Sequence, residues 1–269
     1  MMKIMLKSSS YLWDPDIYLY EGDIFSVRWY SVLFILGFII GRFLVVGAYK
    51  REKKYDTTVD LQMLYMVFGI LIGSRIGHVI FYEPEILSRG IIEVLSFWKG
   101  GLASHGAAIG IILGIIIFQF NYKLKSTLWI FDKLTVPVTL GGVFIRLGNF
   151  INSEILGTYT NSNFGVIFEN RGEILPRHPA QLYESFGYLI LFLILRRIYP
   201  KTNHIQGYLL GVFLAGIFSI RFLIEYVKES QGGFEEILPF LSTGQWLSIP
   251  LIISGLIIIL LAKSKKEVV

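Results

Sequence analysis

Residues 29–48 read WYSVLFILGFIIGRFLVVGA, a run in which Arg42 is the only charged side chain. A helix rises about 1.5 Å per residue, so a run of this length can cross about 30 Å of hydrocarbon. Comparable runs recur along the chain and predict an all-α, polytopic membrane protein with about seven transmembrane helices. The expected helices lie near residues 29–48, 60–81, 103–121, 127–146, 181–199, 206–227 and 246–263.

The composition indicates the same class of protein. Hydrophobic residues make up 54% of the chain, charged residues 17%, and the mean hydropathy is +0.59. A soluble chain of this size is rarely so apolar. The span at 127–146 is the weakest, because Asp132 and Lys133 lie inside it and Pro137 removes a backbone donor. We therefore expect this helix to be kinked or broken.

Basic residues follow the first, third, fifth and seventh expected helices. They are Lys50, Arg51, Lys53, Lys54, Lys123, Lys125, Arg196, Arg197, Lys201, Lys263, Lys265 and Lys266. All of them fall on one side of a seven-pass chain, and the positive-inside rule makes that side cytoplasmic. The membrane domain at 29–263 then has a periplasmic N-terminal segment, 1–28, a periplasmic head segment at about 147–180 and a cytoplasmic tail, 264–269. The net charge of +5 needs no nucleic-acid partner, because these clusters account for it.

The stretch GVFIRLGNFINSEILG, residues 142–157, places polar groups in this apolar setting. Arg146, Asn149 and Asn152 recur every third residue and share one face if the helix continues that far. A charge at bilayer depth needs a partner or a function, and Glu154 is the obvious counter-ion for Arg146. This face could hold a phosphate.

Two further polar pairs lie in the fifth and sixth expected helices. Arg221 and Glu225 are spaced i,i+4, so they can neutralise one another within the bilayer. Two arginines, Arg146 and Arg221, beside one anion would also make a phosphate clamp. Gln181 and Glu184 open the fifth helix, where capping and compensation of the helix dipole explain them without a function.

Three other features each have a structural interpretation. His105 lies at the outer end of the third helix between glycines, where a lone histidine is more often structural. Arg75 has the structural interpretation of a side chain that extends to the membrane interface. Gly73 and Gly77 form a ridge of small residues for helix packing. The chain has no cysteine, which excludes a disulfide framework and a thiolate nucleophile or metal ligand of its own.

The chain resembles the bacterial prolipoprotein diacylglyceryl transferases from about Tyr11 to Pro250. The stretch from Arg146 to Gly157 is similar to the signature sequence of that family. The supporting blocks are residues 28–30 (RWY), 73–77 (GSRIG), 104–106 (SHG), 178–184 (HPAQLYE), 221–225 (RFLIE) and 244–250 (GQWLSIP).

The resemblance implies a transferase of the bacterial inner membrane that acts in lipoprotein biosynthesis, with its active site toward the periplasm. Its substrates would be phosphatidylglycerol and the signal peptide of a preprolipoprotein with a lipobox cysteine, in contact with membrane lipids. It implies catalytic roles for Tyr30, His105, Arg146 and Arg221, and substrate binding by Arg146, Asn149, Glu154, Gly157, Arg221 and Glu225. No metal or cofactor is implied. Ile217 and His78 depart from the family pattern, in which tyrosines are common at both positions.

The chemistry of the implied reaction agrees with these residue types. A thiol with a pKa of about 8.5 must lose its proton, and the departing phosphate must be stabilised. His105 is the expected general base, Arg146 and Arg221 the phosphate clamp, with Asn149 as a neutral donor, and Tyr30 a group that orients the headgroup or relays a proton. The main alternative is a secondary transporter or channel for an anionic solute, which also uses arginines at broken helices. A seven-helix receptor is a third possibility.

Overall fold

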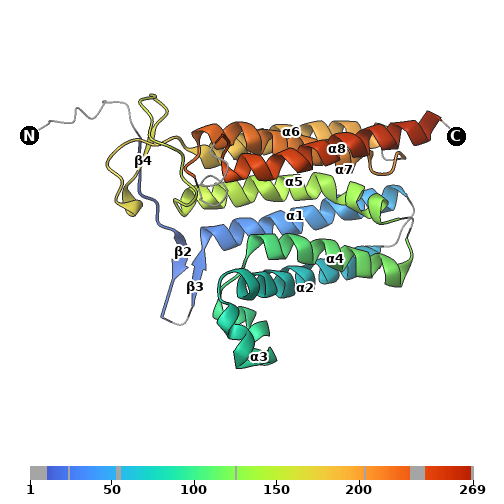
Figure 1. The fold of residues 1–269 in the computed structure, drawn as a ribbon, viewed down its shortest axis with the longest axis horizontal. Coiled ribbons are helices and arrows are strands. Elements are labelled where there is room, and N and C mark those ends of the chain that lie inside the picture. The colour runs from blue at the N-terminus through green and yellow to red at the C-terminus, as the bar shows by residue number, and fades with distance from the viewer. Residues whose placement is uncertain are drawn as a thin grey trace, which may run out of the picture. The chain divides into compact units, whose positions relative to one another are not determined.

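A computed structural model describes residues 11–23, 25–52, 56–124, 126–202, 204–230 and 240–267 (Figure 1). Most of the described chain is helical. Six of its helices are long and apolar enough to cross a membrane: Trp29–Arg51, Thr58–Phe81, His105–Tyr122, Thr127–Ile151, Tyr208–Val227 and Thr243–Ala262. Large apolar side chains such as Phe120 and Leu223 lie exposed on these helices, as expected of surfaces that face lipid. The protein is therefore a multi-pass membrane protein.

The fifth expected helix forms but is less apolar than the others. Helix α6, Ala180–Thr202, is 23 residues long, yet it is not among the six apolar spans. It carries Glu184, Arg196 and Arg197, which lower its hydropathy. The count of seven transmembrane helices thus stays a prediction.

Helix α5, Thr127–Ile151, differs from the helix expected at 127–146. It is one unbroken helix with Pro137 inside it, so the expected break is absent from this described segment. Asp132 and Lys133 are buried within it. The helix also ends at Ile151, which places Arg146 and Asn149 on the helix itself.

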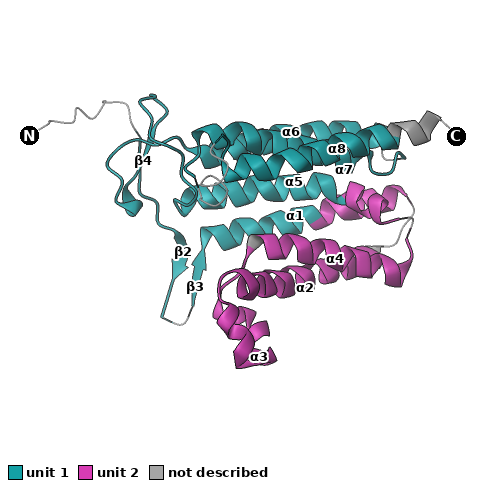
Figure 2. Ribbon diagram, in the orientation of Figure 1, with its two compact units in different colours: residues 1–41, 134–269 teal, residues 42–133 magenta. Residues whose placement is uncertain are grey.

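The chain divides into two compact units, residues 1–41 with 134–269 and residues 42–133 (Figure 2). Unit 1 contains short strands that an all-α prediction did not include. Strand β1, Tyr11–Trp13, pairs in parallel with β4, Val166–Phe168, and β2, Tyr18–Glu21, forms an antiparallel hairpin with β3, Ser26–Arg28. Strands β1 and β4 belong to a small apolar core, in which β4 packs with Phe150, Leu156, Trp13 and Leu182. Residues 1–10 and 268–269 of the expected terminal segments lie outside the described residues, as do Lys53, Lys54 and Lys125.

The helices of unit 1 pack closely around α6 and α7. Besides the end of α5, they are α6, α7, Tyr208–Ile224, and α8, Thr243–Glu267, and a short helix η4, Glu225–Val227, continues α7. Helix α7 packs against both α6 and α8. Gly142 on α5 allows Tyr188 of α6 to lie against it, since a Cβ there would be 3.2 Å from the Tyr188 ring. This contact brings the polar end of α5 next to the start of α6.

Unit 2 is built on two helices whose backbones touch. Helix α2, Asp56–Phe81, packs along α4, Ser104–Tyr122, through glycines on both helices. A Cβ on Gly77 would lie 2.8 Å from the Gly106 Cα, and Gly73 meets the same stretch of α4. The ridge of small residues predicted at Gly73 and Gly77 is confirmed.

Arg75 of α2 is a structural clasp in unit 2. Between α2 and α4 the chain forms η1, Pro84–Arg89, α3, Ile91–Leu95, and η2, Phe97–Lys99. The guanidinium donates to the carbonyls of Glu93 at 3.1 Å, Val94 at 3.2 Å and Gly100 at 2.9 Å, and the residue is 4% exposed. The prediction that Arg75 extends to the membrane interface is therefore wrong, because its donors are satisfied inside the protein.

Candidate active site

The signature stretch closes on itself around Glu154. Helix α5 ends at Ile151, and the chain then turns through Ser153 and Ile155, which both have positive φ, of 52° and 59°. This turn brings the Glu154 carboxylate back to the helix, where it accepts hydrogen bonds from Asn149 Nδ2 at 3.1 Å and Asn152 Nδ2 at 3.2 Å. Asn149 on the helix and Asn152 just beyond its end thus bind the same carboxylate, although α5 does not continue as one helical face as far as Asn152.

The counter-ion of Arg146 is Glu184, and the prediction of Glu154 is wrong. Arg146 Nε pairs with the Glu184 carboxylate, and its Nη1 donates to Asn149 Oδ1 at 3.1 Å. The Glu184 side chain is 1% exposed, so it is too deep to serve as a solvated capping group. Gln181, also 1% exposed, donates to the backbone carbonyl of Glu154 at 2.6 Å. Glu184 thus contacts the helical part of the signature stretch, and Gln181 contacts its turn.

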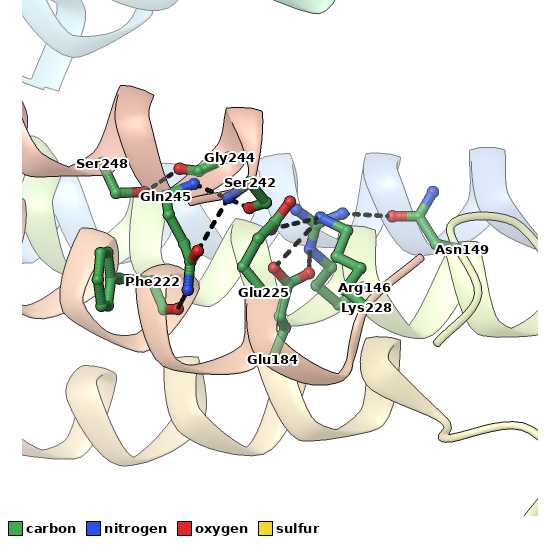
Figure 3. Close-up of polar contacts among 10 residues, drawn as sticks. All are labelled: Arg146, Asn149, Glu184, Phe222, Glu225, Lys228, Ser242, Gly244, Gln245 and Ser248. Carbon is green, nitrogen blue, oxygen red and sulfur yellow. Dashed lines mark hydrogen bonds and ion pairs between the residues drawn. The ribbon is translucent and has the colours of Figure 1, made fainter. Parts of the chain in front are cut away.

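Lys228 extends this set of charges on the other side of Glu184 (Figure 3). Its Nζ lies 3.9 Å from Glu184 Oε1 and 3.4 Å from Glu225 Oε2. Its side chain is 3% exposed. Glu225 therefore pairs with Lys228, and the predicted ion pair between Glu225 and Arg221 does not form in the structure.

Backbone pairing places Lys228 next to Gly157, the last residue of the signature. Gly157 and Lys228 form an antiparallel bridge, and Thr158 N donates to Val227 O at 2.9 Å. A side chain at Gly157 would collide with the backbone carbonyls of His178 and Val227. Gly157, which the family pattern implies is a substrate-binding residue, is thus the position where segment 225–230 can approach the signature closely.

Lys228 is buried deeply enough to change the pKa of its amine. Burial lowers the pKa of the Lys228 amine below its ordinary 10.5, although Glu184 and Glu225 oppose this effect. The positive charges of Arg221 and Arg146 also lower it. The amine is therefore held among charges from α5, α6, α7 and η4.

Gly244, at the start of α8, leaves room for the Glu225 side chain. A Cβ at Gly244 would collide with the Glu225 carboxylate, so only glycine lets that carboxylate lie against α8. Gln245 fixes this corner, since its Nε2 donates to Phe222 O at 3.4 Å and its Oε1 accepts from Ser242 N at 3.0 Å (Figure 3). The block at 244–250 thus supports the charged cluster.

Arg221 lies near this cluster but is not paired within it. The side chain is half-buried and makes no ion pair or hydrogen bond to any residue in the described ranges. Tyr188 of α6 and Lys228 both interact electrostatically with Arg146 and with Arg221. The two arginines therefore share two neighbouring ionisable groups, but Arg146 is paired and Arg221 is unpaired among the described residues.

Tyr30 packs directly on the signature helix. The residue is half-buried near the start of α1, Trp29–Arg51, and a Cβ on Gly148 would lie 2.6 Å from its Cδ2 atom. The Tyr30 hydroxyl interacts electrostatically with both Glu154 and Arg146. Gly148 therefore permits a contact that brings Tyr30 to the polar residues of α5.

His105 belongs to unit 2, whereas Arg146 and Arg221 belong to unit 1. It is exposed in the first turn of α4. The backbone N–H of Ala103 donates to Ser74 O at 2.9 Å, which fixes the residue before this turn to α2. His78, which departs from the family pattern, stacks on Tyr82 and lies 3.1 Å from Glu83 Oε1.

Sequence reasoning missed three residues of the cluster: Glu184, Tyr188 and Lys228. The helix dipole is sufficient to explain an acidic residue at Glu184, and Tyr188 is buried in an apolar run that gives no polar signal. Lys228 stands three residues after Glu225, a helical spacing that could have been considered beside Arg221. Among the described residues, no group of acidic, histidine or cysteine side chains is suited to a metal ion.

The fold and this cluster define a multi-pass helical membrane protein with a network of buried ion pairs at the end of its signature helix. The family model described as prolipoprotein diacylglyceryl transferase matches residues 18–261. The chain belongs to the prolipoprotein diacylglyceryl transferase family.

Curated relatives, each named phosphatidylglycerol–prolipoprotein diacylglyceryl transferase, are similar over nearly the whole chain. The protein of Tolumonas auensis is 40% identical over 94% of this chain and 98% of its own length. That of Chloroherpeton thalassium is 40% identical over 94% of this chain and 95% of its own. That of Chlamydia trachomatis is 39% identical over 89% of this chain and 93% of its own length.

Proposed function

We propose that this protein is a transferase that moves the diacylglyceryl group of phosphatidylglycerol to a prolipoprotein, the reaction for which its relatives are named. The structural observation that carries the proposal is Arg221, a half-buried guanidinium unpaired within the described residues and close to a network of paired charges. A phosphodiester headgroup supplies the anion that such a guanidinium binds well. Family membership disfavours the alternative of an anion transporter or channel.

We further propose that the acceptor in this transfer is the lipobox cysteine thiol and that the product is a thioether. The thiolate sulfur attacks the glycerol carbon that bears the phosphate. The C–S bond forms as the C–O bond breaks, and the electron pair of that bond leaves with the oxygen of glycerol phosphate. The thiol proton goes to a base, which we assign to His105 because histidine is the common general base at neutral pH.

The remaining residues act on the phosphate or hold the groups that do. Arg221 stabilises the charge that develops on the departing phosphate. Arg146 supplies N–H groups beside it while Glu184 balances its charge, and Asn149 adds a neutral donor. Tyr30 orients the headgroup against the signature turn, where Glu154 is held by amides.

The proposed location is the bacterial inner membrane, with the active site toward the periplasm and the N-terminus outside. It is supported by the basic residues, which would all face the cytoplasm in a seven-pass chain. Reporters fused after Lys54, Lys125, Arg197 and Lys266 should read as cytoplasmic, and fusions at Gly90 and Gly172 as periplasmic. A cytoplasmic signal at Gly172 would contradict this topology.

The direct test of the function is an assay with the purified protein, phosphatidylglycerol and a lipobox peptide. Mass spectrometry should find the diacylglyceryl adduct on the peptide, and a peptide with serine in place of the cysteine should stay unmodified. His105→Gln should lose most of the transfer rate while it still binds phosphatidylglycerol, because glutamine hydrogen-bonds but does not accept the proton usefully. Loss of affinity in step with rate would instead assign His105 to substrate binding.

A further inference from the structure

The buried charges of unit 1 form a chain of alternating sign. Arg146 pairs with Glu184, Glu184 lies 3.9 Å from Lys228, and Lys228 lies 3.4 Å from Glu225 (Figure 3). The cations and the carboxylates in this chain are equal in number, so it is neutral in itself. Arg221 stands outside the chain, on α7, one turn before Glu225.

Glu225 has two cations within helical reach. Arg221 precedes it by four residues and Lys228 follows it by three, and both spacings allow an ion pair. The Glu225 side chain is only 4% exposed, and a buried carboxylate without a cation is strongly destabilising. In the structure Lys228 fills this need, and Arg221 is left without a carboxylate partner in the described ranges.

The position of Lys228 is fixed by the signature and not by its own helix. Helix η4 ends at Val227, and the backbone after it pairs with the signature, where Glu229 N donates to Leu156 O at 3.0 Å. This pairing and the bridge to Gly157 direct the amine into the cluster. A lysine at this point of the chain is held in place before any ligand arrives.

We infer that Lys228 is a positioning residue of the proposed reaction: by neutralising Glu184 and Glu225, it keeps the Arg221 guanidinium open for the phosphate of the lipid headgroup. The inference rests on the proposed function, since the phosphate in question is that of phosphatidylglycerol. Without Lys228, Glu225 takes Arg221 as its partner, and the lipid must compete with a buried carboxylate for the same guanidinium. Lys228 therefore acts through Arg221 and does not itself contact the lipid.

The test compares Lys228→Met, Lys228→Arg and the double variant Lys228→Met with Glu225→Gln. Each is purified in detergent, and its affinity for phosphatidylglycerol in mixed micelles is measured together with KM and kcat for transfer. Diacylglycerol, which lacks the phosphate, is the control lipid. Lys99→Met is the matched control protein, because it removes an exposed lysine whose Nζ pairs with Glu93 at 2.6 Å in unit 2.

We expect Lys228→Met to weaken phosphatidylglycerol binding at least tenfold and to raise KM more than it lowers kcat. Lys228→Arg keeps the charge and should stay close to wild type, as should Lys99→Met. The double variant removes one cation and one carboxylate, so the cluster stays balanced and Arg221 stays open. It should bind phosphatidylglycerol at least fivefold better than Lys228→Met, and binding of diacylglycerol should not change across the series.

Two outcomes would overturn the inference. Equal affinities of wild type and Lys228→Met would mean that Lys228 does not control Arg221, and a double variant as weak as Lys228→Met would mean that Lys228 contacts the lipid itself. The double variant also tests the inference if Lys228→Met fails to fold, since it preserves the charge balance. A wild-type protein that binds phosphatidylglycerol without transferring the diacylglyceryl group would overturn the proposed function and leave the role of Lys228 in binding intact.

Discussion

Arg75 in unit 2 and the charged cluster in unit 1 are two ways to bury a guanidinium. Arg75 donates to backbone carbonyls, and its hydrogen bonds hold segment 93–100 against α2. In unit 1, Arg146 and Lys228 meet carboxylates, and one further guanidinium, Arg221, stays open among the described residues. The hydrogen bonds of Arg75 are directed at carbonyls of its own unit, whereas a balanced cluster with one extra cation can accept an anion. The difference separates a structural clasp from the binding site that we propose.

The largest expected effect is a loss of stability when Arg75, the clasp of unit 2, is replaced. Arg75→Met leaves the carbonyls of Glu93, Val94 and Gly100 without their donor, and each buried unsatisfied group costs about 1–3 kcal/mol. We expect a loss of about 3 kcal/mol or more in the free energy of unfolding, measured by thermal unfolding in detergent and by yield. Arg89→Met, an exposed arginine of η1, is the control and should change little. A melting temperature equal to that of wild type would mean that Arg75 is not a clasp.

Removing the guanidinium of Arg221 should lower activity and leave stability unchanged, the reverse of what we expect at Arg75. Arg221→Met deletes the cation proposed to hold the phosphate, and we expect the transfer rate to fall about 100-fold, equivalent to about 2.7 kcal/mol. The melting temperature should stay near that of wild type, because no ion pair or hydrogen bond of this side chain is lost within the described residues. A variant that unfolds, or one that keeps its activity, contradicts the assignment.

Lysine substitutions sharpen the contrast between the two arginines. Arg146→Lys and Arg221→Lys each keep the charge but lose the planar fork, and each should lower activity about tenfold, or about 1.4 kcal/mol. Only Arg146→Lys should also lower the melting temperature, because lysine cannot contact Glu184 and Asn149 together as Arg146 does. Equal melting temperatures for the two variants would remove this distinction.

The smallest expected effect is the dependence of phosphatidylglycerol binding on pH. Burial lowers the pKa of Lys228 below 10.5, so the amine loses its proton as the pH rises through that lowered value. Glu225 then lacks its cation and competes with the lipid for Arg221, whereas Glu184 keeps Arg146, and phosphatidylglycerol binding should weaken a few fold on the alkaline side. Lys228→Arg keeps its charge and should move this loss to higher pH. An alkaline limb that is identical in both proteins would exclude Lys228 as its source.

The sequence predicted the helices well because length and apolar content suffice to identify them. All seven expected stretches form helices, although α5 ends at Ile151 instead of residue 146 and six of the seven pass as apolar spans. The glycine ridge on α2 was predictable for the same reason, since small residues four apart share a face. The strands were not, because β1 and β4 have three residues each and are held by a core assembled from distant segments.

The structure brings most of the expected polar residues of unit 1 to the signature stretch, but their ion-pair partners differ from those expected; their roles in a site stay predictions. Arg146, Asn149, Glu154, Arg221 and Glu225 all lie in unit 1, as their shared family pattern implies, yet every expected ion pair was wrong. The partner of Arg146 depends on how α5 packs against α6 at Gly142, which helical spacing cannot reveal. The partner of Glu225 depends on the bridge between Gly157 and Lys228, a contact between distant segments. Helical spacing permits either Arg221 or Lys228 as the partner of Glu225, and the tertiary structure selects Lys228.

The glycine contact between α2 and α4 also limits how lipids can move around this protein. Gly69, Gly73 and Gly77 meet Gly106 and Gly110 with their backbones in contact along several turns. An acyl chain needs a gap between helices to slip sideways from the bilayer, and helices in backbone contact leave no such gap. Along these turns the seam between α2 and α4 is therefore too tight to admit an acyl chain.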